Sequence, residues 1–369
     1  MPSGGENAVP VAVVGGGIAG CAACLALSRR GIGAVWVAPA MPAADIPGES
    51  LAAAAPPLLD NLGVGHLLDD PAHRREQSGY TSWGSAALLE RHAAAQAGGS
   101  GHVLDRRRFE DGLAEAARRC GEIRVIDRPL ADFRHTGTGW MLSTDAGQRV
   151  GARILIDATG RRATIGRRLG RFRRLDRLVA ACAFLRQVEA DIDPTPATLI
   201  EAVEDGWWYA TLLADRRLVI NFYSDPDLMP RRIGSDLTIW KELAGRTSYI
   251  SRWIDSAGYA LSQPPRLATA GTAWLDDAAG ADWLAVGDAA ASFDPLSAHG
   301  MTTALWTGIE AAQAAARMLA GDVSAAQDYA ARLRAGVAHF SRERGIIYSR
   351  ETRFCDRQFW QRRQGRNVP

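Results

Sequence analysis

The sequence predicts an α/β fold, with a second domain built on an antiparallel sheet and a helical segment at the C-terminal end. Three observations support this prediction. The chain opens with a short apolar strand, a glycine-rich turn and a helix. Between residues 176 and 265 the pattern changes to successive short strands rich in β-branched and aromatic residues. Residues 282–287 then return to a buried type of strand, which an alanine-rich helix over 302–319 follows.

The first domain is therefore predicted to be discontinuous, because its last strand and helix come after the antiparallel segment. The expected boundaries are 8–75, 100–170 and 266–325 for the first domain, 76–99 and 171–265 for a substrate-facing second domain, and 326–369 for the C-terminal helical segment. That last segment is rich in arginine, and we expect its aromatic residues to pack on the body of the protein.

Composition limits the function classes. The 369 residues are 47% hydrophobic and 23% charged, which is typical of a soluble globular protein, and the net charge of +2 gives no reason to expect nucleic acid. No apolar run approaches the roughly 20 residues of a membrane span. The first residues lack the features of a signal peptide, and the five cysteines lack regular spacing, so a cytoplasmic location is expected.

The first elements, in chain order, are a strand over Val11–Val14, a helix over Cys21–Arg30 and a strand over Ala34–Val37. Between strand and helix lie Gly15, Gly17 and Gly20, spaced as Gly-x-Gly-x-x-Gly. In this context the first glycine permits a tight turn, the second lets backbone approach a pyrophosphate, and the third lets helix and sheet pack closely. The N–H groups at the helix start favour phosphate, so the segment predicts a dinucleotide site.

Two features inside this unit allow more than one interpretation. Ala38 ends the second strand, where an acidic side chain usually bonds the ribose, so the group that holds the ribose is left open. Cys21 and Cys24 form a C-x-x-C within the predicted helix. The partners of a metal site are missing, so we predict that these thiols pack in the core and that the protein has no metal site.

The later elements follow as a charged amphipathic helix over Arg106–Cys120 and a series of strands. In the first domain the expected strands are 123–126, 140–143 and 153–158, and in the second domain they are 179–188, 206–213 and 217–223.

Two further segments carry a family resemblance. Asp157-Ala158-Thr159-Gly160-Arg161 resembles the D-x-x-G segment of single-component flavin monooxygenases, and 287–295 resembles their G-D-A-x-x-x-x-D-P segment. With the first glycines, these motifs occur in the order found in the para-hydroxybenzoate-hydroxylase-like superfamily, which includes aromatic hydroxylases and flavin-dependent halogenases. The resemblance implies an FAD cofactor. The residues implied to bind it are Gly15, Gly17, Gly20, Arg106, Asp157, Gly160, Gly287, Asp288, Pro295, Gly300 and Met301.

These residue types suit those roles. Asp288 follows the strand 283–286, and its carboxylate could accept a hydrogen bond from a ribityl hydroxyl, although an aspartate there could also only cap a turn. The helix after Pro295 could stabilise negative charge on the N1–C2 oxygen edge of a reduced flavin. Arg106 resembles a flavin-contacting arginine, with a surface salt bridge as its alternative.

Candidate substrate and catalytic residues are fewer. Trp207, Trp208 and Tyr209 could form a stacking wall for an aromatic ring, but alternate strand residues face opposite sides, so both tryptophans cannot line it. His299 would lie beside the isoalloxazine and relay a proton, or it is a loop histidine in water. Glu49 would contact flavin or substrate, or cap a helix.

Within this superfamily, halogenation is disfavoured. Gly48-Glu49-Ser50 also resembles the halogenases, but those enzymes carry a lysine in their first third and a W-x-W-x-I-P segment. Lys241 is the only lysine of this chain, and it lies in the predicted substrate domain.

The chain is more similar to the LodB and GoxB type of flavoprotein, which acts in tryptophylquinone biogenesis. The shared motifs are the P-G-E-S segment at 47–50, the G-W-W-Y segment at 206–209 and the D-P-L-S segment at 294–297. The resemblance implies hydroxylation of an aromatic substrate, either a tryptophan of a peptide or protein precursor or a free small molecule. In that chemistry NAD(P)H binds transiently and reduces FAD, O2 forms a C4a-hydroperoxyflavin, and this transfers oxygen to the ring.

Two other functions stay open at this point. A flavin-dependent dehydrogenase or reductase of a small molecule would share every binding motif. A non-catalytic maturation partner that retains the flavin fold would fit Ala38 and the arginine-rich C-terminal segment.

Overall fold

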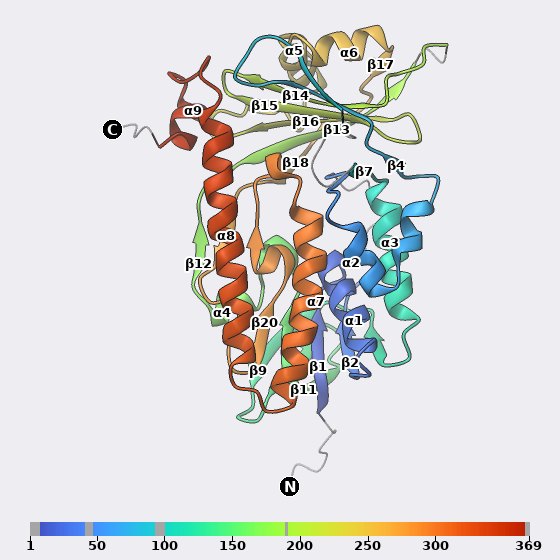
Figure 1. Ribbon diagram of the computed structural model, residues 1–369, viewed down its shortest axis with the longest axis vertical. Helices are drawn as coiled ribbons and strands as arrows, with labels where there is room; N and C mark the ends of the chain where they lie inside the picture. Colours follow the sequence, from blue (N-terminus) through green and yellow to red (C-terminus); the bar gives the residue numbers. More distant parts are fainter. Residues whose placement is uncertain (1–7, 41–46, 93–99, 189–190, 366–369) are drawn as a thin grey trace.

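The computed structural model describes residues 8–40, 47–92, 100–188 and 191–365, arranged as two stacked halves with a long helix along one side (Figure 1). The helices are α1 (Ile18–Ser28), α2 (Pro56–Leu62), α3 (Arg106–Arg118), α4 (Gly166–Leu169), α5 (Leu237–Gly245), α6 (Ile250–Ser256), α7 (Gly300–Leu319), α8 (Ala325–Ser349) and α9 (Gln358–Arg363).

The lower half in Figure 1 contains a seven-stranded sheet. Its strands, in spatial order, are β8 (Ile123–Ile126), β2 (Ala34–Val37), β1 (Val9–Val14), β11 (Arg149–Asp157), β10 (Trp140–Thr144) and β9 (Leu130–His135), with β20 (Trp283–Ala285) also paired to β11. The pairs that join β8, β2, β1, β11 and β20 are parallel, whereas β10 and β9 continue antiparallel. Parallel neighbours need crossover helices, which α1 and α3 supply.

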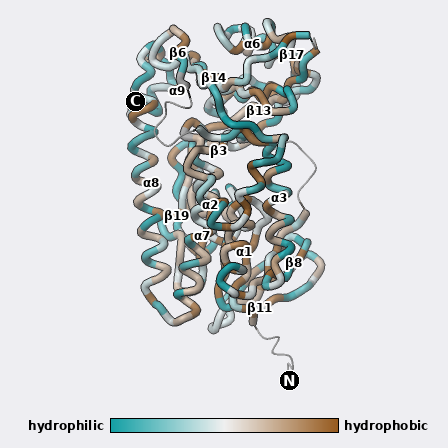
Figure 2. The backbone as a smooth tube through the Cα atoms, turned by 45° about the vertical axis from the view of Figure 1, so that its right-hand side comes forward, coloured by the Kyte–Doolittle hydropathy of each residue, from teal (hydrophilic) through white to brown (hydrophobic). Residues whose placement is uncertain are grey.

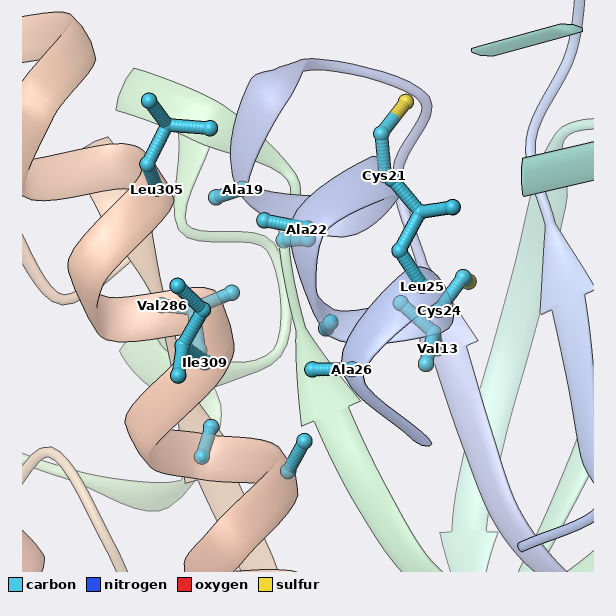
Figure 3. Packing of buried hydrophobic residues seen from close by; sticks show 14 of the residues in the cluster. Val13, Ala19, Cys21, Ala22, Cys24, Leu25, Ala26, Val286, Leu305 and Ile309 are labelled. Carbon is cyan, nitrogen blue, oxygen red and sulfur yellow. The ribbon is translucent and has the colours of Figure 1, made fainter. Parts of the chain in front are cut away.

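Helices α1 and α7 form the centre of this half. Ten residues of α1 are buried, and its mean hydropathy is accordingly high (Figure 2). Gly308 of α7 allows the close approach, since a Cβ there would lie 2.7 Å from the carbonyl oxygen of Ala19. Cys21 and Cys24 are on the side of α1 away from α7 (Figure 3), and both are buried free thiols, as their packing role predicted.

The upper half is an eight-stranded sheet. Its strands, in spatial order, are β17 (Tyr259–Ala260), β13 (Val179–Gln187), β16 (Leu218–Ser224), β15 (Gly206–Leu212), β14 (Ala197–Val203), β5 (Ser78–Ser82) and β6 (Leu89–His92), with β18 (Arg266–Thr269) also paired to β13. All its pairs are antiparallel except β14 with β5. Helices α5 and α6 cover the face turned away from the lower half.

Two further sheets are small and three-stranded. One contains β3 (Ser50–Leu51), β7 (His102–Val103) and β4 (Arg74–Arg75), and the other contains β12 (Phe172–Arg174), β19 (Ala273–Leu275) and β21 (Ala291–Ser292).

The predicted fold class is confirmed: strands β2 and β8 have the predicted bounds, and β13, β15 and β16 lie within one residue of theirs. Strand β18 pairs with the upper sheet, although its residues were expected in the first domain. Strands β14, β5 and β6 and helices α5 and α6 were not predicted.

The C-terminal segment packs on the body, as expected. Helix α8 runs along both halves (Figure 1), and Tyr348, Phe359 and Trp360 are fully buried. Arg363 is buried as well, and its charge is paired there, because both of its terminal nitrogens donate to Asp225. Across the described ranges, no helix has the length and hydropathy to cross a bilayer, and no group of His, Cys, Asp or Glu side chains could hold a metal.

Candidate functional site

A cavity of about 490 Å³ opens between the two halves. Its lining comes from the start of α1, the 47–50 segment, Arg106, the turn after β11, the segment from Val286 to the start of α7, and the inner face of the upper sheet. The three segments with family motifs thus converge on one cavity, even though they are far apart in the sequence.

The glycines at the start of α1 have distinct surroundings. Gly15 has a φ of 120°, and a Cβ there would lie 2.1 Å from the carbonyl oxygen of Ala158. A Cβ on Gly20 would lie 2.1 Å from the carbonyl oxygen of Gly15. Gly17 lines the cavity, and apart from its chain neighbours no described residue has an atom within 4 Å of its Cβ position. Gly15 and Gly20 therefore shape the turn, and Gly17 leaves its backbone open to a ligand.

Asp157 lies behind the cavity wall and not in it. Its Oδ1 accepts hydrogen bonds from the backbone and hydroxyl of Thr159, and its Oδ2 accepts from the N–H groups of Ile165 and Gly166. This fully buried carboxylate holds the turn that places Gly160 in the lining. The expected cofactor contact of Asp157 is thus replaced by a structural role.

In the Gly287 segment, too, some motif residues line the cavity and others only shape the turn. Gly287 has a φ of 56° and lies against α1, where a Cβ would be 2.7 Å from the Cβ of Ala19, so it shapes the turn outside the lining. Asp288 does line the cavity, and its carboxylate lies 3.3 Å from the Nε of Arg161. Pro295, Gly300 and Met301 line it too, so the N-terminus of α7 points to the same space as that of α1. Both helix starts favour negative charge there.

The turn before α7 is anchored by a buried network that the sequence did not reveal. Asp294 is fully buried, and its Oδ2 accepts from the Nε of Arg344 at 3.1 Å and from the hydroxyl of Tyr348 at 2.8 Å. Arg344 also donates to Asp176 at 2.7 Å. Helix α8 thereby fixes the position of the cofactor-side turn.

Arg106 supports the opposite side of the cavity. Its Nη1 donates to the carbonyl oxygens of Pro47 and Gly48 at 3.0 and 3.2 Å, and its Nε bonds Glu110 at 2.7 Å. The predicted flavin arginine therefore lines the cavity and also positions the 47–50 segment.

Glu49, in that segment, is buried at the cavity wall, with 1% of its surface exposed. Its Oε1 accepts from the N–H of Gly48, whereas Oε2 has no partner among the described residues. Burial raises the pKa of Glu49 to about 7, although its own N–H, the N–H of Gly48 and the charges of Arg106 and Arg217 oppose the rise. Near neutral pH this carboxyl can hold or release a proton.

The upper sheet provides the third wall. Trp207 and Tyr209 line the cavity, whereas Trp208 faces the other way and packs on Phe222 and Trp240. The predicted alternation is confirmed, and the substrate role of Trp208 is wrong because its side chain belongs to the core under α5 and α6.

Trp207 stacks on Tyr223 with ring centroids 4.0 Å apart. The hydroxyl of Tyr209 lies 2.9 Å from that of Ser50.

Asn221 on β16 is a cavity residue to which no sequence motif points. This side chain is 1% exposed and lines the cavity, and neither amide atom has a hydrogen-bond partner in the described part of the chain. It pairs in register with Cys182 on one side and Tyr209 on the other, so the three side chains share the cavity face.

His299 is not part of this cavity. It is exposed and lines a second cavity of about 440 Å³ between α7 and α8, together with His339 and Phe340. Ala298 has a left-handed φ of 53°, which turns the chain sharply just before the histidine. The predicted position beside the isoalloxazine is therefore not supported.

Two further positions bear on function. Ala38 is buried at the end of β2, so the acidic ribose partner is absent there. Lys241 is exposed on α5, on the side of the upper sheet away from the cavity, so no lysine reaches the lining.

Comparison with known proteins finds similar FAD-dependent enzymes, both in sequence and in structure. The chain is 26% identical over 292 residues to the putative FAD-dependent oxidoreductase LodB of Marinomonas mediterranea, covering 76% of each chain. Among solved structures it resembles the peptidyl tryptophan dihydroxylase QhpG of tryptophylquinone biogenesis, with a TM-score of 0.78, 23% identity and coverage of 97% of this chain and 79% of that one.

The myxobacterial chondrochloren halogenase CndH, an FAD-dependent halogenase, has a TM-score of 0.86 and 19% identity, with coverage of 97% of this chain and 86% of that one. The family model for tryptophan halogenase matches residues 86–369, well over half of the sequence. The chain therefore belongs to the tryptophan halogenase family.

Proposed function

We propose that this protein is an FAD-dependent monooxygenase that hydroxylates an aromatic ring, and that the ring is a tryptophan side chain of a peptide or protein. The observation that carries the proposal is the composition of the cavity. One side offers two helix N-termini and a glycine without a neighbouring side chain, and the other offers aromatic and amide side chains from the upper sheet.

The residues present fit an FAD. Gly17, Ile18 and Ala19 would hold the pyrophosphate at the start of α1, and Asp288 would accept a hydrogen bond from the ribityl chain. Gly300 and Met301 would lie against the isoalloxazine at the start of α7. When bound and reduced by NAD(P)H, the flavin would supply the activation of O2.

The chain's own groups would then position the reaction. The start of α7 stabilises negative charge on the flavin side of the cavity. The apolar and aromatic part of the upper sheet excludes water and holds a planar ring through contacts with Tyr209 and the edge of Trp207. The carboxyl of Glu49 can exchange a proton with the cavity near neutral pH.

Hydroxylation is favoured over halogenation by the position of the single lysine. The resemblance assigns halogenases a lysine in their first third, and this chain has only Lys241, across the upper sheet from the cavity. The structurally similar QhpG, a peptidyl tryptophan dihydroxylase, supports the same choice.

The test is a product analysis with the FAD-loaded protein. It would be supplied with NADH or NADPH, O2 and a tryptophan-containing peptide, in the presence and absence of bromide. We expect consumption of O2 and a mass increase of one oxygen atom in both cases. Incorporation of bromine would contradict the proposal, and so would NAD(P)H consumption with saturation of a double bond and no oxygen gained, which would identify a reductase.

A further inference from the structure

Two residues of the cavity, Glu49 and Asn221, carry buried polar atoms that have no hydrogen-bond partner among the residues that the structure describes. They are the Oε2 of Glu49 and both the Oδ1 and Nδ2 of Asn221, in side chains that are each 1% exposed. Burial of such groups without partners is destabilising, so they are rare in folded proteins and call for an explanation.

The fold holds both residues in place from several sides. Asn221 lies in a central strand, paired in register with Cys182 and Tyr209. The hydroxyl of Tyr209 is 2.9 Å from that of Ser50, the residue next to Glu49. Burial raises the pKa of Tyr209 well above its ordinary value, and the charge of Glu49 contributes to the rise. The carboxyl and the amide thus face the same part of the cavity.

The hydroxyl of Tyr223, two residues along the same strand, comes near the amide of Asn221 without making a regular hydrogen bond to it, and many of the other groups around the amide are apolar or already engaged. Ala180, Ile200 and Trp207 line the same wall, and the N–H of Trp207 donates to the hydroxyl of Tyr348 at 3.1 Å. A primary amide offers one acceptor and two donors, which match a ring edge that carries both an N–H and an oxygen. A hydrocarbon ring could not satisfy it.

We propose that Asn221 is a specificity-determining residue that binds the polar edge of an indole-type ring, with Glu49 as the neighbouring polar group. The ring N–H donates to Oδ1 of Asn221, and Nδ2 donates to an oxygen atom on the ring where one is present. This inference rests on the proposed function, because it deepens the choice of tryptophan as substrate.

The test uses three probes of similar size with the oxidised, FAD-loaded protein, in which no turnover takes place. Benzothiophene lacks the N–H, indole has it, and oxindole has an N–H beside a carbonyl group. By calorimetric titration we expect affinity to rise in that order, by roughly tenfold at each step, since each added hydrogen bond satisfies a buried group. Asn221→Leu should bind the three probes within about twofold of one another.

Phe222→Leu is the matched control. Phe222 is the next residue of the same strand, equally buried, but its side chain faces the core under α5 and α6. This variant should keep the full order of affinities. Retention of the order in Asn221→Leu would overturn the inference, as would equal binding of the probes by the unchanged protein. A loss of FAD affinity in Asn221→Leu would assign the amide to the cofactor and overturn it as well.

The two proposals can fail separately. If the unchanged protein orders the probes as expected but adds no oxygen to tryptophan, the recognition site stands and the hydroxylase does not. If it hydroxylates tryptophan but Asn221→Leu still prefers indole over benzothiophene, only the assignment of Asn221 fails.

Discussion

The cofactor-side wall and the sheet-side wall of the cavity are built on different principles. The cofactor side consists of helix starts and turns, where glycine and backbone N–H groups form much of the surface and the side chain of Asp157 supports it from behind. On the sheet side the surface is made of side chains, among them Trp207, Tyr209 and Asn221.

Because the two walls are built differently, substitutions on them should have different effects. A cradle of backbone and helix dipoles recognises phosphate and tolerates little substitution, because a Cβ meets other backbone within 2.1 Å at Gly15 and Gly20. A wall of side chains on a sheet can be changed one residue at a time without disturbing the strands. We therefore expect substitutions on the first wall to affect folding or FAD binding, and those on the second to affect substrate choice.

The sharpest test of the first wall compares Gly15→Ala with Gly17→Ala. The first places a Cβ against the carbonyl of Ala158 at a φ of 120°, which should lower the free energy of unfolding by about 2 to 6 kcal/mol. The second has open space around its Cβ, so stability should change by less than about 1 kcal/mol. Denaturant unfolding of the FAD-free protein measures both.

Gly17→Ala should nevertheless lose FAD, because the added methyl group occupies the space that the pyrophosphate needs. Titration of FAD into the folded variant would show this loss. Equal stability of the two variants, or full FAD affinity in Gly17→Ala, would remove the distinction between turn-shaping and ligand-facing glycines.

The second prediction concerns Glu49, which lies where the two walls meet. Its pKa of about 7 in the folded protein is above the value of 4.5 for an unburied glutamate. The folded state therefore binds this proton more tightly than the unfolded state does. Its contribution to stability is complete below pH 4.5, falls as the pH rises toward about 7, and changes no further above that.

Glu49→Gln removes this titration. Between about pH 5 and pH 8, the unchanged protein should lose about 2 to 3 kcal/mol of unfolding free energy relative to the variant. Unfolding of the FAD-free protein at both pH values gives the difference. Glu122→Gln serves as a control, because that exposed carboxyl bonds Ser28 and its pKa is lowered, so its titration lies below this window. Parallel pH profiles for Glu49→Gln and the unchanged protein would show that Glu49 is charged in the fold.

The contrast between the walls also explains what the sequence could and could not reveal. The turns of the cofactor side are contiguous segments whose glycines and aspartates have a recognisable spacing, and this spacing is enough to assign Gly17, Gly160 and Asp288 to the site. The spacing did not show which residues touch a ligand. Asp157 and Gly287 belong to the motifs, yet they work behind the wall through hydrogen bonds and close packing.

On the sheet side the informative relations are between strands. Asn221 stands in the apolar run 218–224, and only its pairing with Cys182 and Tyr209 places it on the cavity face. Strand β14 escaped prediction for a similar reason, since Leu199 packs in the core under α5 and α6 and Ala202 packs in the cluster that contains Tyr348 and Trp360. His299 shows the opposite error: it adjoins the cofactor helix in sequence, but it follows a left-handed residue, Ala298, and its side chain lines another cavity.

The third prediction tests the cofactor side without affecting the fold. Asp288→Ala should raise the dissociation constant of FAD roughly 10- to 100-fold, which corresponds to the loss of a hydrogen bond to a charged group. Its ion pair with Arg161 is partly exposed, so stability should fall by at most about 1 kcal/mol. FAD titration measures the affinity. Asp276→Ala is the control, since that carboxylate pairs with Arg173 away from the cavity. An unchanged affinity in Asp288→Ala would remove this residue from the site.

The last prediction has the smallest expected effect, and it bears on the choice between hydroxylation and halogenation. Lys241→Ala removes the only lysine of the chain, from an exposed position on α5. Stability should change by less than about 0.5 kcal/mol, and the rate of oxygen insertion should stay the same within error. Mass analysis of the product and the rate of O2 consumption measure the outcome. A large loss of product formation would mean that α5 takes part in the chemistry, and the division of the upper sheet into a reactive inner face and a structural outer face would no longer hold.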